Sequence, residues 1–268
     1  MSRLIRLCVC LQLGQMPILD YLFGTMTVTE TLGYGFAWAS AFIQDRYQER
    51  TTEPPQTAHR TTDFMDRVIQ AQAKFPEIVD DVTATIYLLA NVVAGSDTTA
   101  SSMSSSIYHV LKHPRVHARL CHELDTAQLS LPARWRDLQQ LPYFNAVMRE
   151  AKRIHPGVGM MLERVVPAGG LSLPDGRFVP EGTIVGINPS VVNRDLETFG
   201  PDADQFVPER WLRASDETEE AYQSRLTRMQ RAILTFGAGP RSCVGKNFSE
   251  VESDKVVATL FAKYKVCL

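Results

Sequence analysis

The residues best suited to chemistry lie near the end of the chain, where one cysteine stands among glycines. This stretch reads Phe236-Gly237-Ala238-Gly239-Pro240-Arg241-Ser242-Cys243-Val244-Gly245, and an amphipathic segment follows it. Glycine permits the tight turns that bring backbone N–H groups close to a sulfur atom, and the first turn of a following helix favours negative charge there. The layout predicts a metal–thiolate site at Cys243. The alternative is a buried cysteine that acts as a small hydrophobic residue.

A second polar group interrupts a long apolar segment. Residues 80–112 contain no proline, which predicts one long helix, and residues 86–94 are apolar almost all round. Glycine and short polar side chains, which are poor helix formers, follow at residues 95–99. We therefore predict a helix through the interior, with a functional segment at Asp97 and Thr98. The alternative is a face of serines and threonines that bond to their own helix carbonyls.

Two charged motifs come next along the chain. Glu150-Ala151-Lys152-Arg153 lies on a helix predicted over residues 142–154, and Pro208-Glu209-Arg210-Trp211 follows some distance later. Taken alone, the spacing of Glu150 and Arg153 fits an exposed ion pair on one helix face, worth about 0.2–0.5 kcal/mol.

Composition excludes several classes of protein. The chain has 268 residues, 44% hydrophobic and 22% charged, with a net charge of −2, which is typical of a globular protein and gives no nucleic-acid footprint. Its five cysteines are odd in number and form no Cys-x-x-Cys pair, so neither a disulfide framework nor a zinc site is indicated, and an intracellular location is expected. We see no membrane anchor, because no stretch of about 20 apolar residues is present.

Together these motifs resemble the cytochrome P-450 family. The cysteine stretch matches the family's heme-binding pattern Phe-x-x-Gly-x-Arg-x-Cys-x-Gly at every fixed position, and residues 94–99 resemble its oxygen-activating motif. The charged motifs match Glu-x-x-Arg and Pro-Glu-Arg-Phe, with Trp211 in the last position. The resemblance covers roughly residues 15–268 and is greatest to fungal members related to pisatin demethylase.

The resemblance implies heme b as cofactor and a role for each matching residue. Cys243 would be the axial iron ligand, and Asp97 and Thr98 would deliver protons during oxygen activation. The other residues expected at the cofactor are Phe236 beside the porphyrin, Gly237, Gly239 and Gly245 in the loop, and Arg241 and Arg164 at the propionates. Glu150, Arg153 and Arg210 would form a structural lock on the proximal side.

Substrate contacts are expected from two segments that flank the predicted heme site. Residues 157–164 should run extended past the pocket, and the long helix should face it. The candidates are Val93, Ala94, Val158, Met160, Met161 and Leu162. For Val158, Met160, Met161 and Leu162, the alternative is that they merely fill the core.

The expected fold is mainly α with a small β-sheet, as in the C-terminal, heme-ligating half of the family fold, with the N-terminal half absent. Residues 1–268 would form a single partial domain, in which residues 1–60 are a helix and loop region before the distal helix, 80–112. Further helices are predicted over residues 63–74, 114–128, 142–154 and 217–230, and the cysteine loop and last helix over 236–262. A hairpin is predicted over 171–179, with a strand over 183–187.

The function implied by the resemblance is that of a heme-thiolate monooxygenase. It would insert one oxygen atom of O2 into a small apolar organic substrate, with electrons from NADPH-cytochrome P-450 reductase, in fungal secondary metabolism or detoxification. Full-length relatives are bound to the endoplasmic-reticulum membrane, through an anchor that this chain lacks. The alternative is a truncated, non-catalytic remnant that binds heme poorly or not at all. A third class, an isomerase with the same fold, commonly lacks the threonine that Thr98 retains.

Overall fold

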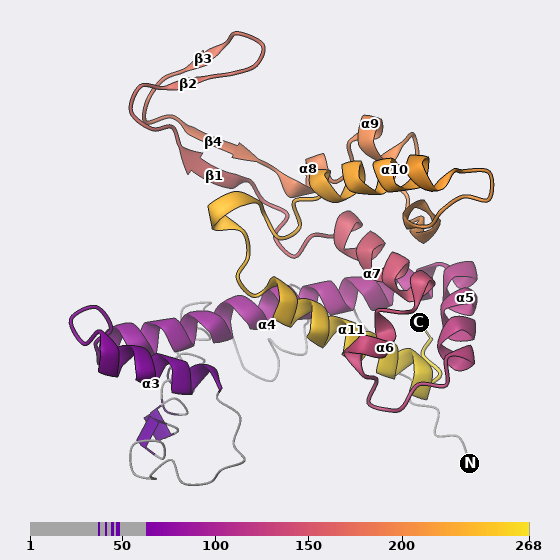
Figure 1. Cartoon of the computed structure of the whole chain (residues 1–268), viewed down its shortest axis with the longest axis horizontal. Helices are drawn as coiled ribbons and strands as arrows, with labels where there is room; N and C mark the ends of the chain where they lie inside the picture. The colour runs from indigo at the N-terminus through magenta and orange to yellow at the C-terminus, as the bar shows by residue number, and fades with distance from the viewer. Residues whose placement is uncertain (1–36, 38–40, 42–43, 46, 49–62, 268) are drawn as a thin grey trace, which may run out of the picture. The chain divides into compact units, whose positions relative to one another are not determined.

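The computed structural model describes residues 37, 41, 44–45, 47–48 and 63–267, and this part of the chain is mostly helical (Figure 1). The described residues before residue 49 are helical, and the rest of the predicted region 1–60 lies outside the described residues. The chain divides into two compact units, and the boundary falls between Asp97 and Thr98. The single partial domain expected from the sequence stays a prediction.

The unit that ends at Asp97 contains helix α3 and the first half of helix α4. Helix α3 spans Phe64–Lys74. Asp63 caps it, because the Asp63 carboxylate accepts the Asp66 N–H at 3.0 Å and the Asp66 carboxylate accepts the Asp63 N–H at 3.0 Å. Helix α4 spans Asp81–Lys112, one residue from the predicted start. The buried residues of this unit form a small cluster of Val68, Val79, Ala84 and Leu88.

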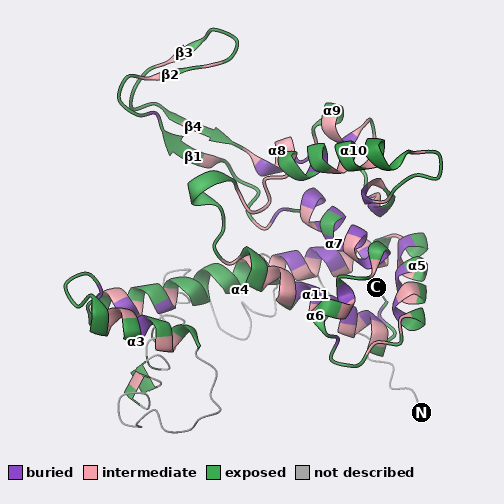
Figure 2. Ribbon diagram, in the orientation of Figure 1, coloured by how far each residue is buried: buried purple, intermediate pink, exposed green. Residues whose placement is uncertain are grey.

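The first half of α4 is not the interior helix that the sequence predicts. Val82, Ile86 and Val93 are 65%, 56% and 44% exposed, and Figure 2 shows this half of the helix largely in the colour of exposed residues. In the described part of this unit, the α3 region packs against the face of α4 that carries Ala84 and Leu88. A helix that is apolar all round needs neighbours on every side to be buried.

The larger unit begins at Thr98 and has its main core among four helices. They are the second half of α4, α5 (Pro114–Thr126), α7 (Pro142–Ile154) and α11 (Lys246–Lys263). Helix α5 ends two residues before its predicted end, and α7 has the predicted bounds. The most deeply buried core residues include Val110, Leu120, Phe144, Val147 and Val257. Burial of such side chains contributes about 1.5–3 kcal/mol each.

Contacts between side chains and backbone fix the start of α7 and its neighbours. The Glu123 carboxylate accepts the N–H groups of Tyr143 and Phe144 at 2.9 and 2.7 Å, so α5 supplies the cap that α7 lacks in its own sequence. A short helix, α6 (Trp135–Leu138), packs against α11. These contacts hold the Glu150–Arg153 segment of α7 in a fixed place.

The strands form two small sheets, where the sequence predicted one. Strand β1 (Leu162–Val165) pairs antiparallel with β4 (Ile184–Ile187), and β2 (Leu171–Ser172) pairs antiparallel with β3 (Phe178–Val179). The hairpin turns at Gly176, where φ is +84°, as the Asp-Gly pair predicts. Each sheet has two strands among the described residues.

Short helical turns connect the sheets to the cysteine loop. They are α8 (Pro189–Val192), α9 (Leu196–Phe199) and the 3-10 helix η1 (Pro208–Trp211), followed by α10 (Glu219–Ala232) and a second 3-10 helix, η2 (Gly239–Arg241). A second core packs Ala146 of α7 against Phe199, Trp211 and Met229. This core ties the segment before the cysteine to α7.

Candidate functional site

Cys243 lies in a tight loop between α10 and α11. Gly237 and Gly239 have φ angles of +68° and +66°, a region that a side chain disfavours. The Cys243 N–H donates to the Phe236 carbonyl at 2.8 Å and closes the loop. Gly245 differs from the other two, because its φ is −83° and a Cβ there would lie 3.8 Å from the Cys243 sulfur, an ordinary contact. The loop geometry thus requires glycine at Gly237 and Gly239 but not at Gly245.

The surface around Cys243 is apolar and exposed. Cys243 itself is exposed, which excludes the buried-cysteine alternative. Val244 is 99% exposed and Phe248, on the first turn of α11, is 77% exposed. Large apolar side chains beside an exposed thiol suit a flat, largely apolar ligand such as a porphyrin. A single cysteine thiolate is enough to bind a heme iron, so no second metal-ligating side chain is required beside Cys243.

The two arginines expected at the heme propionates have no carboxylate partner among residues 63–267. Arg241 and Arg164 are both exposed, and Arg164 Nη1 donates to the Glu163 carbonyl at 2.6 Å. Guanidinium groups without an acidic partner are suited to carboxylates of a bound ligand. Phe236 is half-buried, and Lys246 Nζ lies 5.8 Å from its ring centre. The donor set around the loop therefore fits heme.

The predicted oxygen-activating segment spans the boundary between the two units, which falls within α4. Asp97 is exposed and ends one unit, and Thr98 is half-buried and begins the other. Within the larger unit, Gly157 packs against this helix, since a Cβ there would lie 3.2 Å from the Thr98 carbonyl. The buried Thr99 shares a hydrogen bond of 3.3 Å with Ser249 of α11. Thus α11, which follows the cysteine loop, lies beside the turn of α4 that carries Thr98 (Figure 1).

Glu150, Arg153 and Arg210 meet in one cluster. Glu150 Oε1 lies 2.7 Å from Arg153 Nη2 and 3.1 Å from Arg210 Nε, and the Glu150 and Arg153 side chains are both 0% exposed. The exposed ion pair that helical spacing alone allows is therefore wrong. A buried pair of this kind needs further hydrogen bonds to offset the loss of water. Those bonds come from the meander, residues 193–211.

Arg153 holds the meander through backbone carbonyls. Its Nη1 donates to the carbonyls of Asn193 and Ala203 at 2.7 and 2.6 Å, and its Nη2 donates to that of Gln205 at 3.0 Å. The guanidinium also lies 5.0 Å from the centre of the Phe199 ring. One side chain of α7 thus binds three backbone carbonyls of the meander, which leads to the cysteine loop.

Two residues of this site were not predicted from the sequence as partners of the charges. Trp211 Nε1 donates to Glu150 Oε2 at 2.8 Å, a contact that the tryptophan in the Pro-Glu-Arg-Phe-like motif could have indicated, because indole carries an N–H that phenylalanine lacks. Asn193, 0% exposed, joins α7 to the start of the cysteine loop. No local sequence pattern points to it.

The predicted substrate contacts lie on the surface. Val93 and Val158 are 44% and 40% exposed, Met160 and Met161 are 75% and 53% exposed, and Ala94 is also exposed. The alternative that these residues fill the core is therefore wrong for Val158, Met160 and Met161. Leu162 is half-buried, and its Cδ1 would lie 3.8 Å from a Cβ at Gly237, so β1 begins against the cysteine loop.

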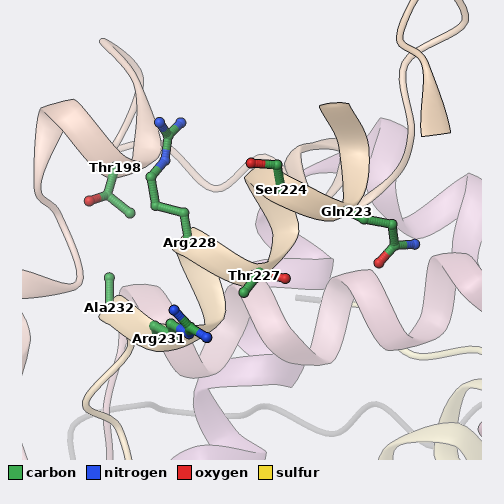
Figure 3. Close-up of a pocket in the computed structure, with 7 residues that line it drawn as sticks. All are labelled: Thr198, Gln223, Ser224, Thr227, Arg228, Arg231 and Ala232. Atoms are coloured by element: carbon green, nitrogen blue, oxygen red, sulfur yellow. The ribbon is translucent and has the colours of Figure 1, made fainter. Parts of the chain in front are cut away.

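A hollow on the surface of α10 contains none of the predicted site residues. It is lined by Thr198, Gln223, Ser224, Thr227, Arg228, Arg231 and Ala232. The guanidinium groups of Arg228 and Arg231 extend in different directions (Figure 3). The residues that line this open hollow are mostly polar or charged, and none is the aromatic or large aliphatic residue typical of a substrate pocket. We assign the functional site to the cysteine loop instead.

Comparison with known proteins matches this chain to one protein family. The family model described as Cytochrome P450 matches residues 12–268. Cytochrome P450 monooxygenase cfoH of Aspergillus candidus is 45% identical over 204 residues, which cover 76% of this chain and 38% of that protein. A cytochrome P450 monooxygenase of Aspergillus terreus is 38% identical over 262 residues, 94% of this chain and 51% of that protein.

A third relative, cytochrome P450 monooxygenase cicH of Emericella nidulans, is 38% identical over 265 residues, 95% of this chain and 50% of that protein. The chain therefore spans between 38% and 51% of the length of these relatives. In this family the heme iron is bound by a cysteine thiolate. Since the family model covers nearly the whole chain and the cysteine lies in a glycine-turned loop before a helix, the chain belongs to the cytochrome P450 family.

Proposed function

We propose that this chain carries the heme-ligating part of a fungal heme-thiolate monooxygenase. The observation that carries the proposal is an exposed cysteine in a loop turned by two left-handed glycines, with exposed apolar side chains beside it. The relatives named above are fungal and are called monooxygenases, which supports the same reaction class. When bound, heme would supply the oxygen activation.

The residues of the loop would bind and orient the cofactor. The Cys243 sulfur would bind the heme iron, Arg241 and Arg164 would pair with the propionates, and Phe236 would pack beside the ring. The buried charges of Glu150, Arg153 and Arg210 would keep the loop in place from the proximal side. None of these lock residues is expected to contact substrate.

Asp97 and Thr98 would move protons. A carboxyl group next to a hydroxyl on one turn of α4 can pass a proton from solvent to the reacting oxygen. Asp97 is exposed, so its carboxyl is in contact with water. Thr98 is half-buried, and Gly157 packs against its backbone. We assign proton uptake to the Asp97 carboxyl and proton delivery to the Thr98 hydroxyl.

The substrate we propose is a small, apolar organic molecule, because the candidate contacts are aliphatic or thioether side chains at Val93, Ala94, Val158 and residues 160–162. Electrons would come from NADPH-cytochrome P-450 reductase, and the reaction would belong to secondary metabolism or detoxification. No helix in the described ranges is long and apolar enough to cross a membrane. An intracellular location, at the endoplasmic reticulum in relatives, is part of the proposal.

A second candidate is a chain that binds heme poorly or does not turn over. It is favoured by the exposure of Val93 and Ala94, two predicted substrate contacts on the half of α4 that α3 covers on one face only. Solubility and heme stoichiometry of the purified chain distinguish this candidate from the monooxygenase.

The test is a heme titration followed by reduction under carbon monoxide. Wild-type chain should show the absorption band of a thiolate-ligated heme, and Cys243→Ser should lose it. Cys121→Ser is the matched control, because Cys121 is half-buried in α5 and away from the loop. A thiolate band that survives in Cys243→Ser would overturn the assignment. Wild-type protein that stays soluble but takes up no heme would favour the second candidate.

A further inference from the structure

Asn193 uses its whole side-chain amide to join two parts of the larger unit. It is 0% exposed and lies directly after α8. Its Nδ2 donates to the Arg153 carbonyl at 3.2 Å and to the Thr235 hydroxyl at 3.2 Å. Its Oδ1 accepts the Leu234 N–H at 3.0 Å. Both N–H donors and the carbonyl of this buried amide are therefore occupied.

These contacts connect the end of α7 to the two residues that precede the cysteine loop. Leu234 and Thr235 come immediately before Phe236, whose carbonyl accepts the Cys243 N–H at 2.8 Å. The Leu234 carbonyl accepts the Gly237 N–H at 2.9 Å, which forms the first turn of the loop. A shift of Leu234 would therefore move both hydrogen bonds that define where Cys243 lies.

Thr235 makes the connection a closed network. Its hydroxyl donates to the Lys152 carbonyl at 2.8 Å and accepts from Asn193. The Asn193 carbonyl in turn accepts Arg153 Nη1 at 2.7 Å. The ion pair of Glu150 and Arg153 is thus linked to the cysteine loop through only one intervening residue. Networks whose members are all satisfied are rigid and specify one arrangement.

We propose that Asn193, together with the Thr235 hydroxyl, is a positioning element that fixes the position of the Cys243 loop relative to the C-terminal end of α7. The proposal rests on the proposed function for its consequence, because the position of the sulfur decides whether a bound heme is held by thiolate. Its structural part concerns the loop alone. Neither residue is among those proposed to contact the cofactor or the substrate, and each acts through the backbone of Leu234 and Phe236.

The test uses the full chain and reads the loop directly. Amide hydrogen exchange of residues 234–243 is measured without heme in wild type, Asn193→Ala, Thr235→Val and Thr235→Ser. Losing one hydrogen bond to a buried group should speed exchange of the Leu234 and Cys243 amides by about tenfold. Thr235→Ser keeps the hydroxyl and should behave as wild type. The α5 amides should not change in Thr235→Val.

Asn188→Ala is the matched control for the asparagine. Asn188 starts α8, five positions before Asn193, and its side chain accepts only the Ser190 N–H, at 2.8 Å, so its loss should leave the loop amides unchanged. If Asn193→Ala does not fold, Thr235→Val against Thr235→Ser decides the question. Equal loop exchange in Thr235→Val, Thr235→Ser and Asn188→Ala would overturn the proposal.

A second measurement, the spectrum of added heme, distinguishes this inference from the proposed function. With heme added and reduced under carbon monoxide, Asn193→Ala and Thr235→Val should show a larger fraction of heme without thiolate ligation than Thr235→Ser and Asn188→Ala. If wild type binds no heme and the loop amides still loosen in Asn193→Ala, the proposed function fails and the positioning role stands. If heme binds through thiolate equally in all variants and loop exchange is unchanged, the positioning role fails alone.

Discussion

The indole Nε1 of Trp211 and the Oε2 of Glu150 are joined by a hydrogen bond of 2.8 Å inside a part of the chain closed to water. The same carboxylate accepts from Arg153, from Arg210 and from the Val207 N–H at 3.0 Å. A buried carboxylate is stable only when such donors replace water. The tryptophan therefore stabilises the charge of Glu150 as well as packing against Phe199 in the second core.

Replacing Trp211 by phenylalanine should lower the free energy of unfolding by about 1.5–3 kcal/mol, the range for a hydrogen bond to a charged group. The phenylalanine ring would still fill most of the space of the indole, so the lost stability measures mainly the hydrogen bond of the indole N–H. Denaturant unfolding of wild type, Trp211→Phe, Glu150→Gln and the double variant measures it. The two single changes should be strongly non-additive. Additive losses would show that the tryptophan and the carboxylate act independently.

Arg153 should be far more sensitive to substitution than an exposed arginine. Arg153→Met leaves Glu150 buried with part of its charge unmatched and leaves the Ala203 carbonyl without its donor, so we expect a loss of about 3–5 kcal/mol. Arg213→Met is the control, because Arg213 and Glu219 are 53% and 56% exposed and such pairs contribute about 0–1 kcal/mol. Comparable unfolding midpoints for the two variants would contradict the buried lock.

Helix periodicity predicted the helical framework closely, because the relevant signals are local. Proline at the first position of α7 and the apolar face after it gave the observed bounds, and the long proline-free segment gave α4 to within one residue. The cysteine loop was also predictable, since left-handed glycines and a following helix leave a local pattern. Gly245 shows the limit, because its ordinary φ leaves no structural reason for the glycine.

Burial and long-range partners could not be predicted in the same way. The apolar stretch Ile86–Ala94 gave no information on which of its faces would be covered, and most of it is exposed. The exposed-pair interpretation of Glu150 failed because burial depends on the meander, which is 40 residues or more away from Arg153 in sequence. Asn193 gave no signal, since a lone asparagine after a short helix is as easily a solvated turn residue.

His109 should make stability depend on pH. Its ring stacks on Phe206, with centroids 4.8 Å apart, and its buried Nδ1 has no hydrogen-bond partner. Burial lowers the pKa of His109 from 6.5 to about 4. Smaller contributions to this pKa come from nearby charged groups: His113, His155 and Lys112 lower it, and Glu150 raises it.

Because the pKa of His109 is lower in the folded state, the unfolded chain binds more protons between pH 4 and 6.5. This contribution to stability is fully present above pH 6.5 and is lost progressively as the pH falls to about 4. His109→Phe keeps an aromatic ring on Phe206 and should lose less stability over this range. His122→Gln, at an exposed position, should follow wild type. Parallel curves for wild type and His109→Phe would count against the effect.

Under the proposed function, and in a protein that turns over, Thr98 should be needed for coupling rather than for heme binding. Thr98→Ala removes a hydroxyl from α4 without changing the cysteine loop, so the thiolate carbon monoxide band should persist. Product formed per NADPH should fall by about tenfold or more, with hydrogen peroxide rising, because general acid catalysis contributes at least that much. Ser96→Ala is the control, since the Ser96 hydroxyl donates to the Val93 carbonyl of its own helix at 3.3 Å. Unchanged coupling in Thr98→Ala would remove Thr98 from the proton path.

The exposed face of α4 should drive self-association of the chain. Val82, Ile86 and Val93 are 65%, 56% and 44% exposed, and spacings of four and seven residues place them on one helix face. Contiguous apolar surface of this kind promotes association, whereas scattered exposed residues do not. Replacing all three by glutamine, a better helix former than valine or isoleucine, should keep α4 helical and lower the scattered light of concentrated protein.

The comparison for this face is a variant with Val191→Gln and Leu196→Gln, which removes two exposed apolar side chains that lie on two different short helices, α8 and α9. This control should scatter light as wild type does, because it leaves the α4 face intact. Sedimentation of all three proteins over a range of concentrations then gives the association constants. We expect the α4 variant to associate at least about tenfold more weakly, since each 1.4 kcal/mol of lost contact is one factor of ten. Equal constants for the α4 variant and the control would mean that another surface holds the copies together.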